Sequence, residues 1–356
     1  MNILESQSYI NDILHNWYSV NKRDLPWRNT TDPYLIWISE VILQQTRVNQ
    51  GLEYYNRFVE RFPNVLELAN AEEDEVLKYW QGLGYYSRAR NLHKAAKQIS
   101  VNFSGRFPSK HNDILELAGI GDYTAAAITS LAYNQPYAVV DGNVYRVLSR
   151  LFGISTPIDT GKGKMEFSEL AQSLISKTEP AIHNQAMMEF GAIQCVPSSP
   201  DCTNCPLQSV CQAFVTNKIT DLPVKQHKTK SSERYFNYLF IRHKDYTYLQ
   251  KRTAKDIWQN LFEFPLIEAN KLLDFKELTE NDTFKRIFSG IETVELIEKT
   301  NPIKHILSHR VIFAQFITLN ISDCNNELDN LINVPLSDID EYAVSRLMEL
   351  FLEKLS

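Results

Sequence analysis

Four of the five cysteines lie within 17 residues, and this cluster constrains the fold of the chain more than any other feature. They follow the pattern C-x6-C-x2-C-x5-C at Cys195, Cys202, Cys205 and Cys211, whereas Cys324 stands alone. The N-terminus lacks a secretory signal pattern, and cytosolic chains rarely keep disulfides. Because thiols are also strong metal ligands, the cluster predicts a metal-binding loop.

The spacing of the four cysteines also bears on which metal they bind. Structural zinc sites favour two separated C-x2-C pairs. One C-x2-C pair with single cysteines on either side suits a cuboidal iron-sulfur cluster, which takes one thiolate at each of four corners. We therefore expect an iron-sulfur cluster, whose role could be limited to ordering the loop.

The spacing of apolar residues changes once along the chain. Up to about residue 215 they recur at helical intervals, as at Ile10, Ile13 and Leu14. Residues 216–233 are polar, rich in lysine and interrupted by proline, as in an exposed linker. The sequence predicts an all-α domain over residues 1–215, this linker, and a second domain over residues 234–356.

The second domain combines strand and helix patterns. Tyr235–Arg242 and Tyr246–Arg252 are aromatic and β-branched runs separated by three turn residues, which predicts a β-hairpin. Val311–Leu319 is a third candidate strand, and Tyr342–Leu355 reads as an amphipathic helix. We therefore predict an α+β fold for this domain.

Charge and hydropathy set weaker limits on function. The chain carries 37 Lys and Arg against 43 Asp and Glu, a formal net charge of -6. This balance is unusual for a nucleic-acid binder, although an acidic chain can still present one basic face. No run approaches the roughly 18 apolar residues of a membrane span. We expect a cytoplasmic protein that has no membrane partner.

A glycine turn between two predicted helices is a candidate anion site. Gly119 and Gly121 flank Ile120, and Asp122 begins the following helix. Glycines let backbone N–H groups approach an anion closely, and the helix N-terminus adds its dipole. A DNA phosphate is the natural anion, although such a turn is also common in ordinary helix connections.

Two carboxyl groups stand in contrasting surroundings. Asp141 precedes a predicted helix as its N-cap, where backbone N–H bonds keep a carboxylate ionised. Glu40 lies on a predicted helix that begins at Asp32-Pro33, and mostly apolar residues lie three or four positions away from it. Desolvation should therefore raise the pKa of Glu40 and leave it protonated near neutral pH.

Nearly the whole chain resembles the MutY family of adenine DNA glycosylases, within the helix-hairpin-helix superfamily. The resemblance rests on six blocks in register, which are Leu25–Arg28, Trp37–Thr46, Gly82–His93, Val140–Val144, Asn184–Ala192 and the four cysteines. Leu261–Pro265 and His305–His309 are similar to the family's C-terminal domain, a relative of the MutT (Nudix) nucleotide hydrolases. The Gly-x5-Glu-x7-Arg-Glu box of those hydrolases is missing, so this domain should recognise 8-oxoguanine without hydrolysing a nucleotide.

The resemblance implies removal of adenine paired with 8-oxoguanine or guanine in double-stranded DNA, by a monomer associated with the nucleoid in a bacterium. Glu40 would protonate adenine, Asp141 would stabilise the sugar cation, and Tyr123 and Asn143 would position the reacting groups. The substrate-binding residues would be Arg28 and Glu189 in the adenine pocket, with Gln45, Thr46, Leu83, Tyr85 and Ser308 at the duplex and the opposing base. The four cysteines would hold a 4Fe-4S cluster.

Tyr123 separates this chain from bifunctional relatives. Those relatives carry a lysine at this hairpin position, which forms the Schiff base that leads to strand scission. An endonuclease III-like glycosylase/lyase is therefore the less favoured enzyme, and a catalytically silent DNA-binding protein of the same fold is the alternative outside enzymes. The chain also departs from the family pattern at Ala118, at Leu307 and in the non-basic loop 196–201.

Overall fold

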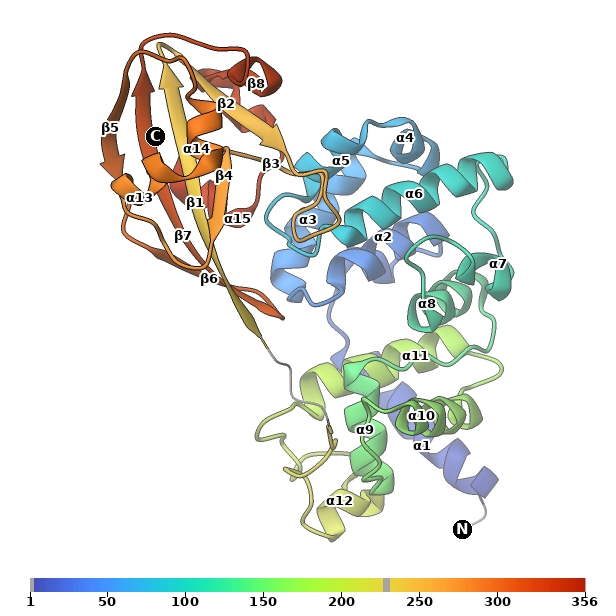
Figure 1. Cartoon of the computed structure of the whole chain (residues 1–356). Coiled ribbons are helices and arrows are strands. Elements are labelled where there is room, and N and C mark those ends of the chain that lie inside the picture. The colour runs from blue at the N-terminus through green and yellow to red at the C-terminus, as the bar shows by residue number, and fades with distance from the viewer. Residues whose placement is uncertain (1–2, 227–230, 356) are drawn as a thin grey trace. The chain divides into compact units, whose positions relative to one another are not determined.

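The computed structural model describes residues 3–226 and 231–355, and these divide into two compact units (Figure 1). The helical unit comprises residues 1–70 and 91–227, and the mixed unit comprises residues 71–90 and 228–356. The predicted combination of an all-α domain and a domain of strands and helices is confirmed. Contacts place residues 71–90 with the C-terminal part of the chain, an association that the linear division into residues 1–215 and 234–356 did not include.

The helical unit contains short and medium-length helices. They are α1 (Ile3–Asn21), η1 (Pro26–Arg28), α2 (Pro33–Leu43), α3 (Val48–Arg61), α4 (Val65–Asn70), α7 (His111–Leu115), α8 (Asp122–Tyr133), α9 (Gly142–Phe152), α10 (Gly161–Leu174), α11 (Pro180–Glu189), the π-turn η2 (Phe190–Gln194), η3 (Gln208–Val210) and α12 (Gln212–Val215), with α6 (Ser87–Asn102) crossing between the units. No described helix is long and apolar enough to cross a membrane.

Capping residues fix the helices that matter for the site. Asp32 accepts a hydrogen bond from the backbone N–H of Tyr34, and Pro33 occupies the first turn of α2, as predicted. Asp141 caps α9, which ends at Gly153 in the left-handed conformation. The α1, α9, α10 and α11 helices pack around one apolar core that includes Leu14. This core holds the first turn of α9 in a fixed place.

The mixed unit is built on a sheet. Its elements are α5 (Glu73–Trp80), β1 (Ser232–His243), β2 (Tyr246–Lys251), β3 (Phe262–Glu263), β4 (Leu266–Ala269), α13 (Phe275–Glu280), α14 (Asp282–Ile287), β5 (Val294–Lys299), β6 (Ile303–Ile306), β7 (Arg310–Ile321), η4 (Leu328–Asn330), β8 (Ile332–Pro335), η5 (Leu336–Glu341) and α15 (Arg346–Leu352). The described strands form one eight-stranded sheet in which β1 and β7 pair in parallel at the centre.

Alternation along β1 assigns its side chains to two cores. Phe236, Tyr238 and Phe240 pack toward α15 on one face, whereas Leu239 and Ile241 pack toward α13 and α14 on the other. The predicted hairpin is confirmed as β1 and β2, and the third predicted strand as β7. The last helix begins later than predicted, because Ser345 caps it and the preceding residues are extended.

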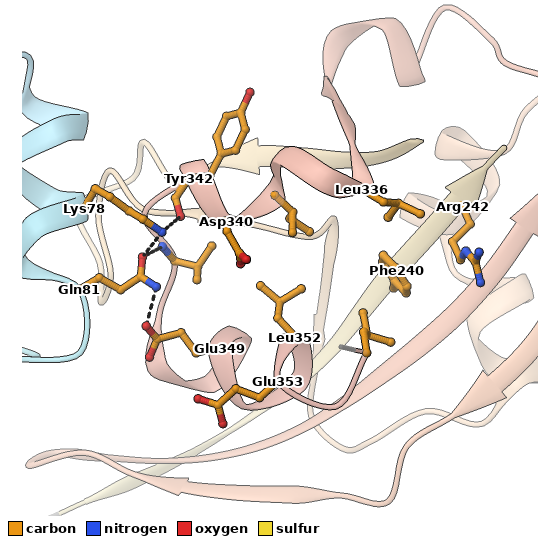
Figure 2. Close-up of a pocket in the computed structure, with 13 residues that line it drawn as sticks. Lys78, Gln81, Phe240, Arg242, Leu336, Asp340, Tyr342, Glu349, Leu352 and Glu353 are labelled. Atoms are coloured by element: carbon orange, nitrogen blue, oxygen red, sulfur yellow. Dashed lines mark hydrogen bonds between the residues drawn. The ribbon is translucent and has the colours of Figure 1, made fainter. Parts of the chain in front are cut away.

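Residues 71–90 join the mixed unit through hydrogen bonds to its C-terminal segment. Figure 2 shows Gln81, which donates to the Glu349 carboxylate at 2.5 Å and accepts from the backbone N–H of Val344 at 3.1 Å. Lys78 donates to the backbone carbonyl of Tyr342 at 3.3 Å. These side chains line a cavity of about 520 Å³ that contains no predicted site residue. The hydrogen bond from Gln81 to Glu349 connects the C-terminal end of α5 to α15.

Candidate active site

A cavity of about 610 Å³ in the helical unit brings most of the predicted catalytic and substrate-binding residues together. Its walls come from η1, α2, α8, α9 and α11. The predicted residues that line it are Arg28, Glu40, Gln45, Thr46, Tyr123, Asp141, Asn143 and Glu189. The two carboxyl groups of the proposed mechanism therefore face one space, as the sequence interpretation required.

Glu40 is only 8 % exposed and has one hydrogen-bond donor. The Tyr123 hydroxyl donates to Glu40 Oε2 at 2.5 Å. Burial raises the pKa of Glu40 to about 7, and Asp141 adds to the rise, while the Tyr123 hydrogen bond and Arg28 act against it. The raised pKa agrees with the expectation from its apolar surroundings.

Asp141 accepts three hydrogen bonds, whereas Glu40 accepts one. Its Oδ1 accepts from the backbone N–H groups of Asn143 at 2.9 Å and Val144 at 2.8 Å, and its Oδ2 accepts from Asn143 Nδ2 at 2.8 Å. Burial raises the pKa of Asp141, whereas these bonds and the charge of Arg146 lower it. The cap bonds act in the expected direction, but burial outweighs them, so the pKa lies above its ordinary value.

Glu189 is an ionised carboxylate inside the protein. It is 0 % exposed and accepts hydrogen bonds from two guanidinium groups, Arg23 at 2.6 to 2.8 Å and Arg28 at 2.5 to 2.9 Å. Burial alone would raise the pKa of Glu189, but these bonds reverse the effect and lower it to about 2. Arg23 was missed by the sequence analysis, since it lies just outside the Leu25–Arg28 block.

We expect Arg28→Met to destabilise the protein by about 2 kcal/mol, because it leaves the buried Glu189 with only one of its two charged donors. The free energy of unfolding from urea titration measures this effect. Arg106 is an exposed arginine, so Arg106→Met is the matched control and should change stability by less than about 0.5 kcal/mol. Equal losses in the two variants would contradict a structural role for the Arg28–Glu189 pair.

Arg146 links the first turn of α9 to the start of the cysteine loop. Its guanidinium donates to Asn143 Oδ1 at 2.8 Å, to the backbone carbonyl of Gly191 at 2.6 Å and to that of Cys195 at 2.7 Å. A Cβ on Gly191 would lie 2.7 Å from the Cβ of Asn143, so only glycine lets η2 approach α9 this closely. No sequence pattern identified Arg146 as part of the site.

The four cysteines line a single small cavity together with Arg150 and apolar side chains. Arg150 donates to Cys195 Sγ at 3.4 Å and to the backbone carbonyls of Val196 and Pro197. Burial raises the pKa of Cys205 to about 11, and the charges of the other three cysteines also raise it, as expected for thiols that lie close together.

The place of these thiols can be compared with the ligand set that a metal cluster requires. Four thiols around one cavity fit a 4Fe-4S cluster, in which each thiolate binds a different iron.

The glycine turn has the predicted helix-hairpin-helix form. It connects α7 to α8, and Gly119 has a positive φ of 76°. A Cβ at Gly119 would lie 2.5 Å from the Cβ of Asn91, so the turn requires glycine at this position. Gly121 is the N-cap of α8 and has open space beside its Cα.

The remaining predicted substrate-binding residues lie in the mixed unit. Leu83, Tyr85 and Ser308 line a cavity of about 700 Å³, where the Tyr85 and Ser308 hydroxyls are hydrogen-bonded at 2.5 Å. Trp258 and His305 also line this cavity, with ring centroids 5.8 Å apart. Sequence analysis named neither of them as a site residue, because neither belongs to a spacing pattern with a specific chemistry.

Comparison with known proteins matches both parts of the chain. Residues 38–177 match the HhH-GPD superfamily of base excision DNA repair proteins, and residues 237–354 match the NUDIX domain. The adenine DNA glycosylase of Buchnera aphidicola subsp. Baizongia pistaciae is 35% identical over 314 residues, which cover 86% of this chain and 85% of that protein. That of Buchnera aphidicola subsp. Acyrthosiphon pisum is 39% identical over 251 residues, or 70% of this chain and 72% of the relative.

Among solved structures, a thermostable thymine-DNA glycosylase superposes with a TM-score of 0.57 at 28% identity. The match covers 61% of this chain and 100% of the glycosylase.

Proposed function

This chain belongs to the adenine DNA glycosylase family of base excision repair, and on that premise we propose that its helical cavity excises adenine opposite 8-oxoguanine or guanine in duplex DNA. The observation that carries the proposal is a pair of buried carboxyl groups, Glu40 and Asp141, in one cavity with different hydrogen-bond donors. One acid is set to hold a proton and the other to remain an anion. Cleavage of a glycosidic bond needs this division of roles.

Glu40 is the general acid of the proposed reaction. Tyr123 donates to Glu40 Oε2, so the acidic proton resides on the other carboxyl oxygen and can be passed to N7 of adenine. Protonation makes the base a better leaving group, and the N-glycosidic bond breaks as electron density moves into the purine.

Asp141 stabilises the positive charge that then develops on the deoxyribose. Its three N–H donors hold the carboxylate in one orientation, and Asn143 fixes both of its oxygens. Water completes the hydrolysis at the sugar. Because Glu40 and Asp141 face a cavity inside the protein, the adenine must first rotate out of the DNA double helix to reach them. This rotation costs less free energy at a mispair than at a normal base pair.

Glu189 is suited to recognise the extruded adenine. Adenine offers its exocyclic amino group as a donor, and an ionised carboxylate is an acceptor only. Arg23 and Arg28 keep Glu189 ionised, and both guanidinium groups also line the cavity. Both oxygens of Glu189 already accept hydrogen bonds from Arg23 and Arg28, so the adenine amino group would bind Glu189 by sharing or displacing one of these donors.

Residues in both units would contact the duplex. The Gly119-Ile120-Gly121 turn would bind a backbone phosphate, and Gln45 and Thr46 would lie against the strands near the excised base. In the mixed unit, Leu83, Tyr85 and Ser308 would contact the opposing 8-oxoguanine.

Cys195, Cys202, Cys205 and Cys211 would hold a 4Fe-4S cluster. When bound, that group supplies structural order to residues 195–211 and balances the charge of the four thiolates. Arg150 would orient Cys195 through its hydrogen bond to the sulfur. Arg146 connects the backbone carbonyl of Cys195 to the Asn143 side chain.

Single-turnover assays on duplexes with A, C or T opposite 8-oxoguanine or guanine test the proposed function. We expect release of adenine alone, with little strand cleavage before alkali treatment, because a tyrosine at position 123 cannot form a Schiff base. Efficient strand scission would favour a glycosylase/lyase, and binding without base release would favour a silent DNA-binding protein. Either outcome would contradict the proposal.

The excision rate should depend on pH through both carboxyl groups. Glu40 acts while protonated, so the rate falls as pH rises above about 7, the pKa that burial gives this acid. Asp141 acts while ionised, so the rate also falls in acid, at a pH above the ordinary range of an aspartate. Single-turnover rates over about pH 5 to 9 measure this profile, and a rate that keeps rising above pH 8 would contradict it.

A further inference from the structure

The loop of residues 82–85, which presents Tyr85, has a strained backbone. Gly82 and Gly84 have positive φ angles of 91° and 73°, and Tyr85 has a φ of 48°. The left-handed conformation is unfavourable for a residue that carries a Cβ, so Tyr85 keeps it only where the surrounding structure holds the loop. The Tyr85 side chain is 46 % exposed, as contact with DNA requires.

One support of this loop comes from its neighbours in the chain. The Trp80 indole N–H donates to the backbone carbonyl of Gly84 at 3.1 Å, and the Arg88 guanidinium donates to the same carbonyl at 3.3 Å. Trp80 is fully buried, so its N–H has a fixed direction. These two bonds hold the loop at Gly84.

The other support comes from Val344, which lies 258 residues after Tyr86 in the chain. The backbone N–H of Val344 donates to Gln81 Oε1 at 3.1 Å, and its backbone carbonyl accepts from the Tyr86 hydroxyl at 3.2 Å. The Tyr86 hydroxyl also accepts from the backbone N–H of Gly82 at 3.3 Å. Both backbone polar groups of Val344 therefore hold the two residues that flank the loop.

Val344 is itself fixed in the mixed unit. It is buried, and so are its neighbours Ala343 and Ser345. The backbone carbonyl of Ala343 accepts from the N–H of Phe262 in β3 at 2.8 Å, and Ser345 caps α15. The loop is thus attached to a part of the C-terminal segment that the sheet and a helix both hold in place.

We propose that Gln81 and Tyr86 are positioning residues, through which Val344 holds the loop in the conformation that enters the duplex and promotes extrusion of adenine. Because Tyr85 is assigned to the duplex by the proposed function, this inference rests on that function. Without these bonds the loop relaxes toward conformations that a tyrosine adopts more readily, and ordering it again on DNA costs free energy. The C-terminal segment then aids extrusion whatever the opposing base.

Tyr86→Phe removes the hydroxyl that connects Gly82 to Val344 and keeps the buried ring. With the protein in saturating excess, we expect the single-turnover rate of adenine release to fall about tenfold, by the same factor opposite 8-oxoguanine and opposite guanine. The pH dependence of the rate should not change, because Glu40 and Asp141 are unaltered.

Gln81→Met removes the second bond to Val344 and should lower the rate about threefold or more. Tyr246→Phe is the matched control, because it removes the same hydroxyl from an exposed tyrosine of the mixed unit, and its rate should equal that of the native chain. Native rates in both Tyr86→Phe and Gln81→Met would overturn the inference. A loss confined to duplexes with 8-oxoguanine would also overturn it, since it would place Tyr86 in base recognition.

Fluorescence of 2-aminopurine in place of the target adenine measures extrusion without base release. We expect the rise in fluorescence on binding to be about threefold smaller in Tyr86→Phe than in the native chain. The midpoint of thermal unfolding should stay within about 4 °C of the native value, which shows that the fold is kept. If the native chain released no adenine, the proposed function would fail, and equal fluorescence in the native chain and in Tyr86→Phe would still overturn the inference.

Discussion

Glu40→Gln is expected to lower the single-turnover rate of adenine release about a thousandfold, since a side-chain amide cannot donate the proton that the leaving base requires. The substitution keeps the volume of the side chain, and its amide oxygen can still accept the hydrogen bond from Tyr123. Affinity for duplex DNA with A opposite 8-oxoguanine should therefore change by less than about threefold. Rapid-quench assays and gel-shift titrations measure the two quantities separately.

The control for this variant is Glu53→Gln, which makes the same chemical change at an exposed position on α3. We expect the excision rate of the control to equal that of the native chain. Retention of more than about a tenth of the native rate by Glu40→Gln would refute the acid role.

Local rules predicted the parts of the site that depend on neighbouring residues in the chain. The N-caps Asp32 and Asp141 were predicted from sequence, because a short polar side chain before a helical run has few other roles. The burial of Glu40 was predicted from helical spacing, since residues three and four positions away were mostly apolar. The resemblance then supplied the pairing of Glu40 with Asp141, which spacing alone could not provide.

Contacts between distant segments could not be predicted in the same way. Arg23 and Arg146 are important because Glu189 and Gly191 lie beside them, more than 40 residues away in each case. The association of residues 71–90 with the C-terminal domain likewise depends on bonds such as that of Gln81 to Glu349. The net rise in the pKa of Asp141 was also missed, because a capping pattern reveals hydrogen bonds but not the depth of burial that opposes them.

Asp141→Asn separates the two roles that this residue combines, a helix cap and an anion. Asparagine caps a helix about as well as aspartate, so its amide oxygen can still accept from the backbone N–H groups of Asn143 and Val144. We therefore expect a loss of stability of about 1 kcal/mol at most, measured by urea titration. The excision rate should fall about a thousandfold, because a neutral amide cannot stabilise the cationic sugar.

Asp32→Asn is the matched control, because it makes the same change at the N-cap of α2. Since Asp32 does not line the cavity, we expect this control to lose no more stability than Asp141→Asn and to keep the native excision rate. If Asp141→Asn kept the native rate, the carboxylate would be only a cap, and the positive sugar would need another stabilising anion. The cavity offers only Glu189 as a second ionised carboxylate among its described lining residues, and both oxygens of Glu189 are already bound by Arg23 and Arg28. The loss of rate in Asp141→Asn should therefore not be compensated from within the site.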